Sequence, residues 1–308
     1  MRCWIFLLIA ALSFAQDDTP VFRTEVSLVK VDAEVQNAQG IGISGLRAGD
    51  FVVYDENQRQ KIVDFASESQ PVRILMLLDV SPSMSKWLAD LGAKSTGALG
   101  ALRSGDEVAL MGFAARSQLF QPLTTDTKSL GGQIIGSIYK QTLGSETLIN
   151  EALVAAANYM GRQPGKARRA ILVVTDNEGA RKSVSDDQVV RALHAANVVL
   201  SAIIVGDGAS QYTRARYVNP ASAPPDVQRF VSETGGQSVM GAAPAEALAP
   251  ILKDLTTRYG FQYTPPPGEE GSFRKIRVEL SPEAAARYPE AKIKARSGYT
   301  VGQAKVTP

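Results

Sequence analysis

Short apolar runs alternate with longer amphipathic stretches through the middle of the chain. A weak apolar run lies at Gln237–Met240, and four clearer ones have the length of buried strands: Ile74–Leu78, Val108–Phe113, Ala170–Thr175 and Val198–Val205. The amphipathic stretches predict helices near residues 85–102, 127–140, 146–161, 185–197, 225–234 and 245–258. Apolar strands separated by helices are typical of a parallel sheet covered on both faces. Right-handed crossovers then predict a doubly wound, Rossmann-like α/β fold over residues 71–258.

Strict alternation of apolar and polar positions replaces these runs before residue 71. In residues 22–66 the alternation is clearest from Val29 to Val35, with the period of a half-buried strand. Two further runs, Phe51–Tyr54 and Lys61–Phe65, predict a hairpin that turns at the polar residues 55–57.

Alternation returns after the middle region, in residues 260–301. A break at residues 265–268, three prolines and a glycine, is followed by Ile276, Val278 and Leu280 at alternate positions. Each flank has only about 40 residues, too few to bury a core alone. Because the two ends of a domain often lie close together, we expect the flanks to form one small β-sandwich around the inserted α/β region.

The first residues have the pattern of a secretion signal. Arg2 supplies a positive charge, residues 4–14 are almost wholly apolar, and Ser13 and Ala15 suit a cleavage site before Gln16. We expect residues 1–15 to be removed as a signal peptide and the mature protein to be secreted or periplasmic. The alternative is that the segment is kept as an anchor, although its apolar run is short for a bilayer span.

The composition limits the chemistry of the mature chain. Hydrophobic residues make up 44% and the formal net charge is +2, so a core can form and no strong field favours nucleic acid. The single cysteine, Cys3, lies in the leader, which excludes disulfides and thiolate ligands. The single histidine, His194, lies in an expected helix, which favours a structural role and disfavours a Ser-His-Asp hydrolase.

Oxygen-bearing side chains gather where the expected strands end. Asp79 ends the first apolar run and is followed by Ser81 and Ser83, while Asp176 ends another run and Thr147 precedes an apolar helix. Ligands of open α/β sheets bind beyond the carboxyl ends of the strands, so we expect these side chains to converge. A set made only of oxygen donors suits a hard divalent cation.

These residues resemble the metal-ion-dependent adhesion site of the von Willebrand factor A (VWA) family. Its motif is Asp-x-Ser-x-Ser, then a separate Thr, then an Asp after an apolar strand, and all five positions are filled in order: Asp79, Ser81, Ser83, Thr147 and Asp176. The resemblance implies Mg²⁺, with Mn²⁺ or Ca²⁺ open, held directly by the three hydroxyls and through water by the aspartates. It also implies a coordination position for a carboxylate of a protein, peptide or glycan partner.

Two local features leave this assignment open. The family typically has Gly where Asn177 stands, so the loop after the second aspartate is expected to differ in shape. Ser145 is an alternative to Thr147, because both precede the same helix. The competing interpretation of the first motif is that Ser83 or Ser85 only caps the next helix.

The flanks resemble a group of exported VWA-related proteins common in acidobacteria. Gly45-Leu46, Asp50-Phe51 and the ending Arg296-Ser297-Gly298-Tyr299 carry this resemblance. It extends the expected architecture over most of the mature chain and implies no particular function.

The resemblance implies an extracytoplasmic binding or adhesion module rather than an enzyme, with no nucleic-acid partner and no membrane span in the mature chain. One alternative is a structural or assembly component of an envelope complex. A metal-dependent hydrolase is less favoured, because phosphatases with a strand-end Asp need a second acid where this chain has Ser81. The charged pairs 168–169 and 181–182 are expected to be solvated. We also hypothesise that the last helix, near 245–258, transmits metal occupancy to the C-terminal flank.

Overall fold

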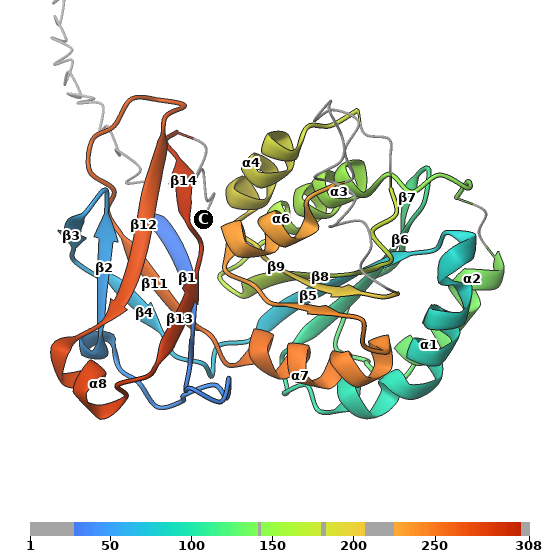
Figure 1. Cartoon of the computed structure of the whole chain (residues 1–308), viewed down its shortest axis with the longest axis horizontal. Helices are drawn as coiled ribbons and strands as arrows, with labels where there is room; N and C mark the ends of the chain where they lie inside the picture. The colour runs from blue at the N-terminus through green and yellow to red at the C-terminus, as the bar shows by residue number, and fades with distance from the viewer. Residues whose placement is uncertain (1–27, 141–142, 180–182, 207–224, 303–308) are drawn as a thin grey trace, which may run out of the picture.

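The computed structural model describes residues 28–140, 143–179, 183–206 and 225–302. Figure 1 shows an all-β region on the left and an α/β region on the right. The expected signal peptide lies outside the described residues and stays a prediction. Within the described ranges, no helix is long and apolar enough to cross a membrane.

A six-stranded sheet forms the centre of the α/β region, in the order β10-β9-β8-β5-β6-β7. Five strands are parallel: β5 (Val72–Asp79), β6 (Glu107–Phe113), β8 (Arg168–Thr175), β9 (Val199–Ile204) and β10 (Ser238–Met240). The edge strand β7 (Ser117–Thr124) runs antiparallel to β6. The sequence did not predict β7, because its side chains are only half-buried or exposed and Pro122 interrupts it.

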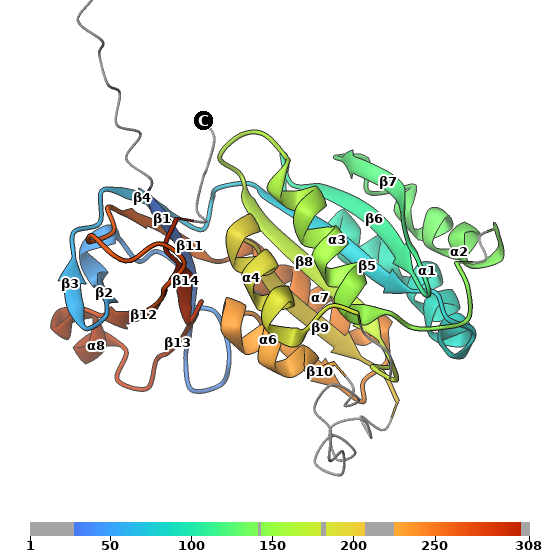
Figure 2. The same cartoon turned by 90° about the horizontal axis from the view of Figure 1, so that it is seen from above.

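Helices cover both faces of this sheet (Figures 1 and 2). One face carries α1 (Ser85–Gly100), α2 (Leu130–Lys140) and α7 (Pro244–Thr256), and the other α3 (Ile149–Gly161), α4 (Asp186–Ala196) and α6 (Val227–Thr234). Alternate residues of β5 face opposite cores: Leu75 and Leu77 pack with the α3 side, while Ile74, Met76 and Leu78 pack with the α1 side. The predicted doubly wound α/β fold is confirmed.

The two flanks join in the all-β region, as predicted. One sheet has the order β13-β1-β11-β4 and the other β14-β12-β2-β3, so each mixes strands from before and after the α/β region. The strands are β1 (Val29–Gln36), β2 (Phe51–Asp55), β3 (Gln58–Gln60), β4 (Asp64–Ala66), β11 (Tyr259–Tyr263), β12 (Phe273–Leu280), β13 (Lys292–Ala295) and β14 (Gly298–Thr300). Short helices η1 (Ala48–Asp50), η2 (Pro82–Met84) and α8 (Pro282–Arg287) complete the described elements.

The expected hairpin of the N-terminal flank is wrong in its second strand. The chain turns at Glu56 and Asn57, whose φ angles are 47° and 67°, and β2 then pairs with β3. The expected second strand was Lys61–Phe65, but residues 64–66 pair with β11 in the other sheet. A two-residue turn with both φ angles positive matches the twist of paired strands, so the chain reverses at once. The polar strand β3 gives no alternation signal in the sequence.

The two ends of the parallel strands have different surroundings. The all-β region lies at the amino end, where the chain enters β5 at Val72 and leaves α7 toward β11. The carboxyl ends, at Asp79 and Thr175, lie on the opposite edge. Since a strand of this length spans roughly 25 Å, the loops after β5 and β8 face away from the all-β region.

Candidate functional site

The three predicted hydroxyl ligands line one pocket at the carboxyl edge of the sheet. Ser81 and Ser83 follow β5, and Thr147 precedes α3, yet all three border the same pocket of about 570 Å³. The Ser81 and Ser83 hydroxyl oxygens are 3.2 Å apart. Segments widely separated in the sequence therefore supply oxygen atoms to one place.

The two predicted aspartates are hydrogen-bonded to the serine loop. The Ser83 hydroxyl donates to Asp176 Oδ2 at 2.5 Å. Asp79 is fully buried, and its Oδ1 accepts the backbone N–H of Ser81 at 3.0 Å. The structure thus brings all five predicted residues together, with the hydroxyls at the pocket and the carboxylates hydrogen-bonded to their loop.

Thr175 is a site residue that the sequence analysis missed. Its buried hydroxyl donates to Asp79 Oδ2 at 2.7 Å and accepts the backbone N–H of Asn177 at 3.0 Å. Thr175 therefore fixes the second carboxylate oxygen of Asp79 and shapes the loop that carries Asp176. The sequence does show a hydroxyl directly before the strand-end Asp176. The contact of that hydroxyl with Asp79, however, follows only from the parallel pairing of β5 and β8.

Asp79 has an environment that disfavours its charged form when no cation is near. Burial raises the pKa of Asp79 to about 6, although hydrogen bonds from Ser81 and Thr175 favour the carboxylate and the charge of Asp176 opposes it. A divalent cation in the pocket would favour the carboxylate. A cation bound in the pocket would therefore stabilise the charged form of Asp79.

The loop after Asp176 approaches Thr147 closely. Asn177 has φ of 58°, in the left-handed region that Asn tolerates better than most residues and that suits the glycine typical of the family. A Cβ on Gly179 would lie 2.5 Å from the backbone oxygen of Thr147. Only glycine fits at position 179, a second feature of the site that the sequence analysis did not identify.

The capping interpretation of the hydroxyls finds no support in the geometry. The N-cap of α1 is Met84, and neither it nor Ser81, the N-cap of η2, makes a side-chain capping hydrogen bond. Leu148, not Thr147, is the N-cap of α3. Ser145 lines the pocket together with Thr147, so the choice between these two stays open.

The donor chemistry of the pocket fits a hard cation. The part of the chain that the structure describes contains no group of three or more His, Cys, Asp or Glu residues suited to a metal. The candidate set instead consists of two aspartates and three hydroxyls, all oxygen donors. Such a set suits Mg²⁺ and related hard cations.

Two predictions about charged residues have different outcomes. Arg168, expected to be solvated, is 2% exposed, and its guanidinium donates to the backbone oxygens of Gln70, Leu255 and Thr256. That expectation was wrong because a positive charge at the start of β8 meets the carbonyl groups at the end of α7. The pair 181–182 lies outside the described residues.

The structure gives His194 a structural role. It is buried, its Nε2 lies 3.0 Å from the backbone oxygen of Glu233, and its ring stacks on Phe273. Burial and the nearby charge of Arg296 lower the pKa of His194 to about 4. His194 therefore packs the all-β region against α4, at the end of the sheet opposite to the pocket.

Comparisons with known proteins identify the class of this domain. Residues 74–179 match the family model of the von Willebrand factor type A domain. The matched segment begins in β5 and ends at Gly179, so it spans all five candidate residues. Residues 74–179 therefore match the VWA domain family. This family suggests an adhesion or protein-interaction module, and VWA domains commonly bind a divalent metal.

Individual relatives are more distant. An uncharacterised protein from Borreliella burgdorferi is 25% identical over 139 residues, which cover 43% of this chain and 40% of that protein. This chain thus spans less than half the length of that relative. Two solved structures each match 60% of this chain and 98% of their own. One is an aerotolerance-related membrane protein from Bacteroides fragilis, with 21% identity and a TM-score of 0.43. The other is BatB from Bacteroides thetaiotaomicron, with 23% identity and a TM-score of 0.42. Manganese-loaded TRAP protein from Plasmodium vivax has 16% identity, 75% and 98% coverage, and a TM-score of 0.44.

Proposed function

We propose that this protein is a metal-dependent binding module that captures a carboxylate of a protein, peptide or glycan partner outside the cytoplasm. The observation that carries the proposal is the pocket of a VWA domain lined by Ser81, Ser83 and Thr147, with Asp176 and Asp79 hydrogen-bonded to the serine loop. In this proposal the module has no catalytic role. The export signal is residues 1–15, and the partner site belongs to the domain at residues 71–258.

The roles of the residues follow from which of them line the pocket. Ser81, Ser83 and Thr147 would hold Mg²⁺ or a similar ion through neutral oxygens, while Asp79 and Asp176 would supply negative charge without filling the pocket. Few charged direct ligands would leave the ion electrophilic toward an anionic oxygen of the partner. Thr175 and the Ser81 backbone fix the orientation of Asp79, so its charge is positioned before the ion binds.

The position of the pocket also supports a binding role. It lies at the carboxyl edge of the sheet, whereas the described parts of the two flanks, residues 29–66 and 259–300, pack at the amino edge. A partner can therefore approach the loops after β5 and β8 without contacting the all-β region. The alternative of a purely structural role predicts that the site residues affect neither metal nor partner binding.

Calorimetric titration of Mg²⁺ and Mn²⁺ into the metal-free full chain tests the proposal. Ser83→Ala removes an exposed pocket hydroxyl with little risk to folding, and Ser85→Ala is the matched control, because that hydroxyl binds the Pro82 carbonyl instead. We expect saturable binding to the unaltered chain and to S85A, and affinity at least about tenfold weaker for S83A. Equal binding to all three would refute the site.

A further inference from the structure

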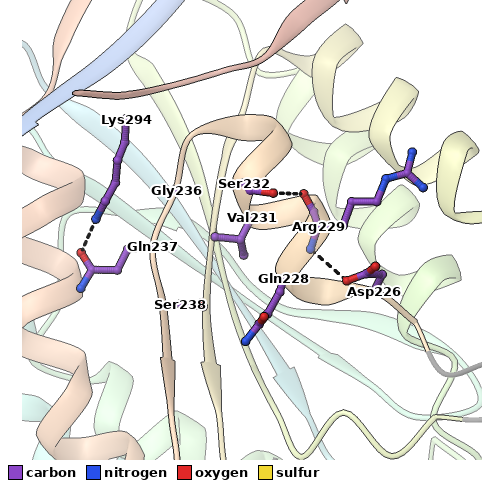
Figure 3. Close-up of a pocket in the computed structure, with 9 residues that line it drawn as sticks. All are labelled: Asp226, Gln228, Arg229, Val231, Ser232, Gly236, Gln237, Ser238 and Lys294. Atoms are coloured by element: carbon purple, nitrogen blue, oxygen red, sulfur yellow. Dashed lines mark hydrogen bonds between the residues drawn. The ribbon is translucent and has the colours of Figure 1, made fainter. Parts of the chain in front are cut away.

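A second pocket lies where the α/β region meets the all-β region. Its volume is about 690 Å³, and it is lined by α6, by the segment that enters β10, and by Lys294 of β13. Figure 3 shows Lys294 reaching across from its strand to Gln237, with Nζ and Oε1 3.5 Å apart. The pocket thus opens the junction of the two regions to solvent.

Two buried carboxyls from different regions meet beside Lys294. Glu34 of β1 is 1% exposed, Asp254 of α7 is 7% exposed, and Lys294 Nζ lies 3.9 Å from Glu34 Oε2. The amide of Gln36 donates to both carboxyls, to Glu34 Oε1 and, at 3.4 Å, to Asp254 Oδ1. One amide therefore joins the first strand of the all-β region to the last helix of the α/β region.

The positive charge near this pair is limited. Arg258 Nη1 lies 3.4 Å from Glu34 Oε2 and 3.8 Å from Asp254 Oδ2, while Nη2 donates to the backbone oxygens of Gly235 and Lys294. Asp254 Oδ2 is buried without a hydrogen-bond partner among the described residues. The two carboxyls thus share one close guanidinium, and Glu34 also has the more distant, partly exposed ammonium of Lys294.

The other charges near β1 are separate from this pair. Asp32, two residues before Glu34 on the same face, is buried where the charges of Lys30, Arg168 and Arg296 act on it. The groups that face Glu34 are Asp254 from α7, Arg258 from the start of β11, and Lys294 from β13.

We propose that Glu34 and Asp254 share one proton, and that this proton closes a pH-sensitive latch between β1 and the C-terminal end of α7. Two carboxylates in one buried site cannot both ionise readily. In agreement with this geometry, burial and the neighbouring Asp254 raise the pKa of Glu34 to about 8. Loss of the proton leaves two buried negative charges opposite Arg258 and weakens the contact between the two regions.

The sign of the pH effect follows from the raised pKa. A carboxyl whose pKa is higher in the folded chain contributes stability that is complete below its ordinary pKa, near 4.5, and is lost as the pH rises through the folded value, near 8. The latch is therefore closed in acid and opens in mild alkali. Lys294 Nζ, 3.9 Å from Glu34 Oε2, lines the pocket that opens this junction to solvent.

Thermal unfolding of the full chain between pH 6 and pH 9 tests the latch. Glu34→Gln keeps the size and the hydrogen-bonding oxygen of the side chain but cannot ionise, and Glu290→Gln is the control, an exposed change elsewhere in the all-β region. We expect the unaltered chain and E290Q to lose on the order of 5 °C in Tm as the pH rises, and E34Q to lose clearly less. Parallel curves for all three proteins would overturn the proposal.

Hydrogen exchange gives a second, local measurement. Corrected for the intrinsic effect of pH, exchange in residues 250–258 should rise several-fold between pH 6.5 and pH 9 in the unaltered chain and stay level in E34Q. If E34Q does not fold, Asp254→Asn makes the same comparison, because it removes the other ionisable carboxyl of the pair. Unchanged exchange in the unaltered chain contradicts the latch.

Discussion

The two ends of the six-stranded sheet are built from different chemistry. At the carboxyl end, small hydroxyl side chains such as Ser83 line a pocket that is open to solvent. At the amino end, large cationic side chains are buried against the backbone, and Arg168, Arg258 and Arg296 are between 1% and 8% exposed. Open oxygen donors suit the capture of an ion, whereas buried guanidinium groups suit a packed junction between two regions.

Each buried arginine binds the C-terminal end of one helix. Arg168 donates to the carbonyls of Leu255 and Thr256 at the end of α7, and Arg258 donates to Gly235, the C-cap of α6. Arg296 binds the end of α4 through the backbone oxygen of His194 and the side chain of its C-cap, Asn197. A positive charge at this position satisfies carbonyls that lack helical partners and complements the helix dipole.

This arrangement explains the ending 296–299 that the sequence analysis singled out. Beside Arg296, the Ser297 backbone N–H donates to the Glu233 carbonyl, and the Tyr299 hydroxyl donates to the buried Asp55. A Cβ on Gly298 would lie 2.3 Å from the backbone oxygen of Arg274, so only glycine fits there. The motif therefore joins the all-β region to α4 and α6, and its role is architectural.

The largest expected effect at the amino end is that of Arg296→Met. The change leaves the Gly298 and His194 carbonyls without their buried donor, and it should lower the free energy of unfolding by about 3 kcal/mol. Urea denaturation followed by circular dichroism measures this loss. Arg277→Met, on the exposed side of β12, is the control and should change stability by less than about 0.5 kcal/mol. Similar losses in both variants would contradict the junction model.

Thr175→Val gives the next largest effect, and it tests the carboxyl end of the sheet separately from the amino end. The substitution removes the hydroxyl that orients Asp79 while keeping the side-chain volume, so Mg²⁺ affinity should fall about tenfold. Thr234→Val is the matched control, because Thr234 is equally buried but its hydroxyl accepts the N–H of Leu200 at the amino end. Calorimetry should show unaltered Mg²⁺ affinity for T234V. Equal affinity in both variants would mean that Thr175 does not position the site.

The sequence predicted the candidate site better than the junction, and the reason is physical. Asp79 and Asp176 end apolar runs, so their common edge follows from strand direction alone. The roles of Thr175 and Gly179 require the distances between neighbouring segments, which no local pattern contains. The burial of Arg168 was missed because a charged residue beside an apolar strand is expected to be solvated. Its partner, the C-terminal end of α7, is distant in the sequence.

A third prediction asks whether the two ends communicate. α7 packs beside α1, which begins directly after the serine loop, and its end is held by Arg168 and Arg258 at the junction. If Mg²⁺ at the pocket is sensed by α7, hydrogen exchange in residues 245–258 should slow by about two- to fivefold on adding the ion. Exchange in β2, which belongs to the N-terminal flank, serves as the internal control and should not change. Identical exchange in both segments with and without Mg²⁺ would show that the ends are independent.

The smallest effect concerns His194. Its contribution to stability changes with pH in the opposite direction to that of Glu34 at the same junction. Burial keeps the pKa of His194 at about 4, below its ordinary 6.5, so its contribution to stability is complete above pH 6.5 and is lost as the pH falls toward 4. Between pH 6.5 and pH 5 the unaltered chain should lose less than about 1.5 kcal/mol through this group. His194→Gln should lose less over this range, since the amide can still donate to the Glu233 carbonyl without becoming charged. Urea denaturation at pH 6.5 and pH 5 compares the two chains. A steeper loss in H194Q than in the unaltered chain would show that His194 is charged in the folded protein, and that the junction stabilises a cation there rather than excluding one.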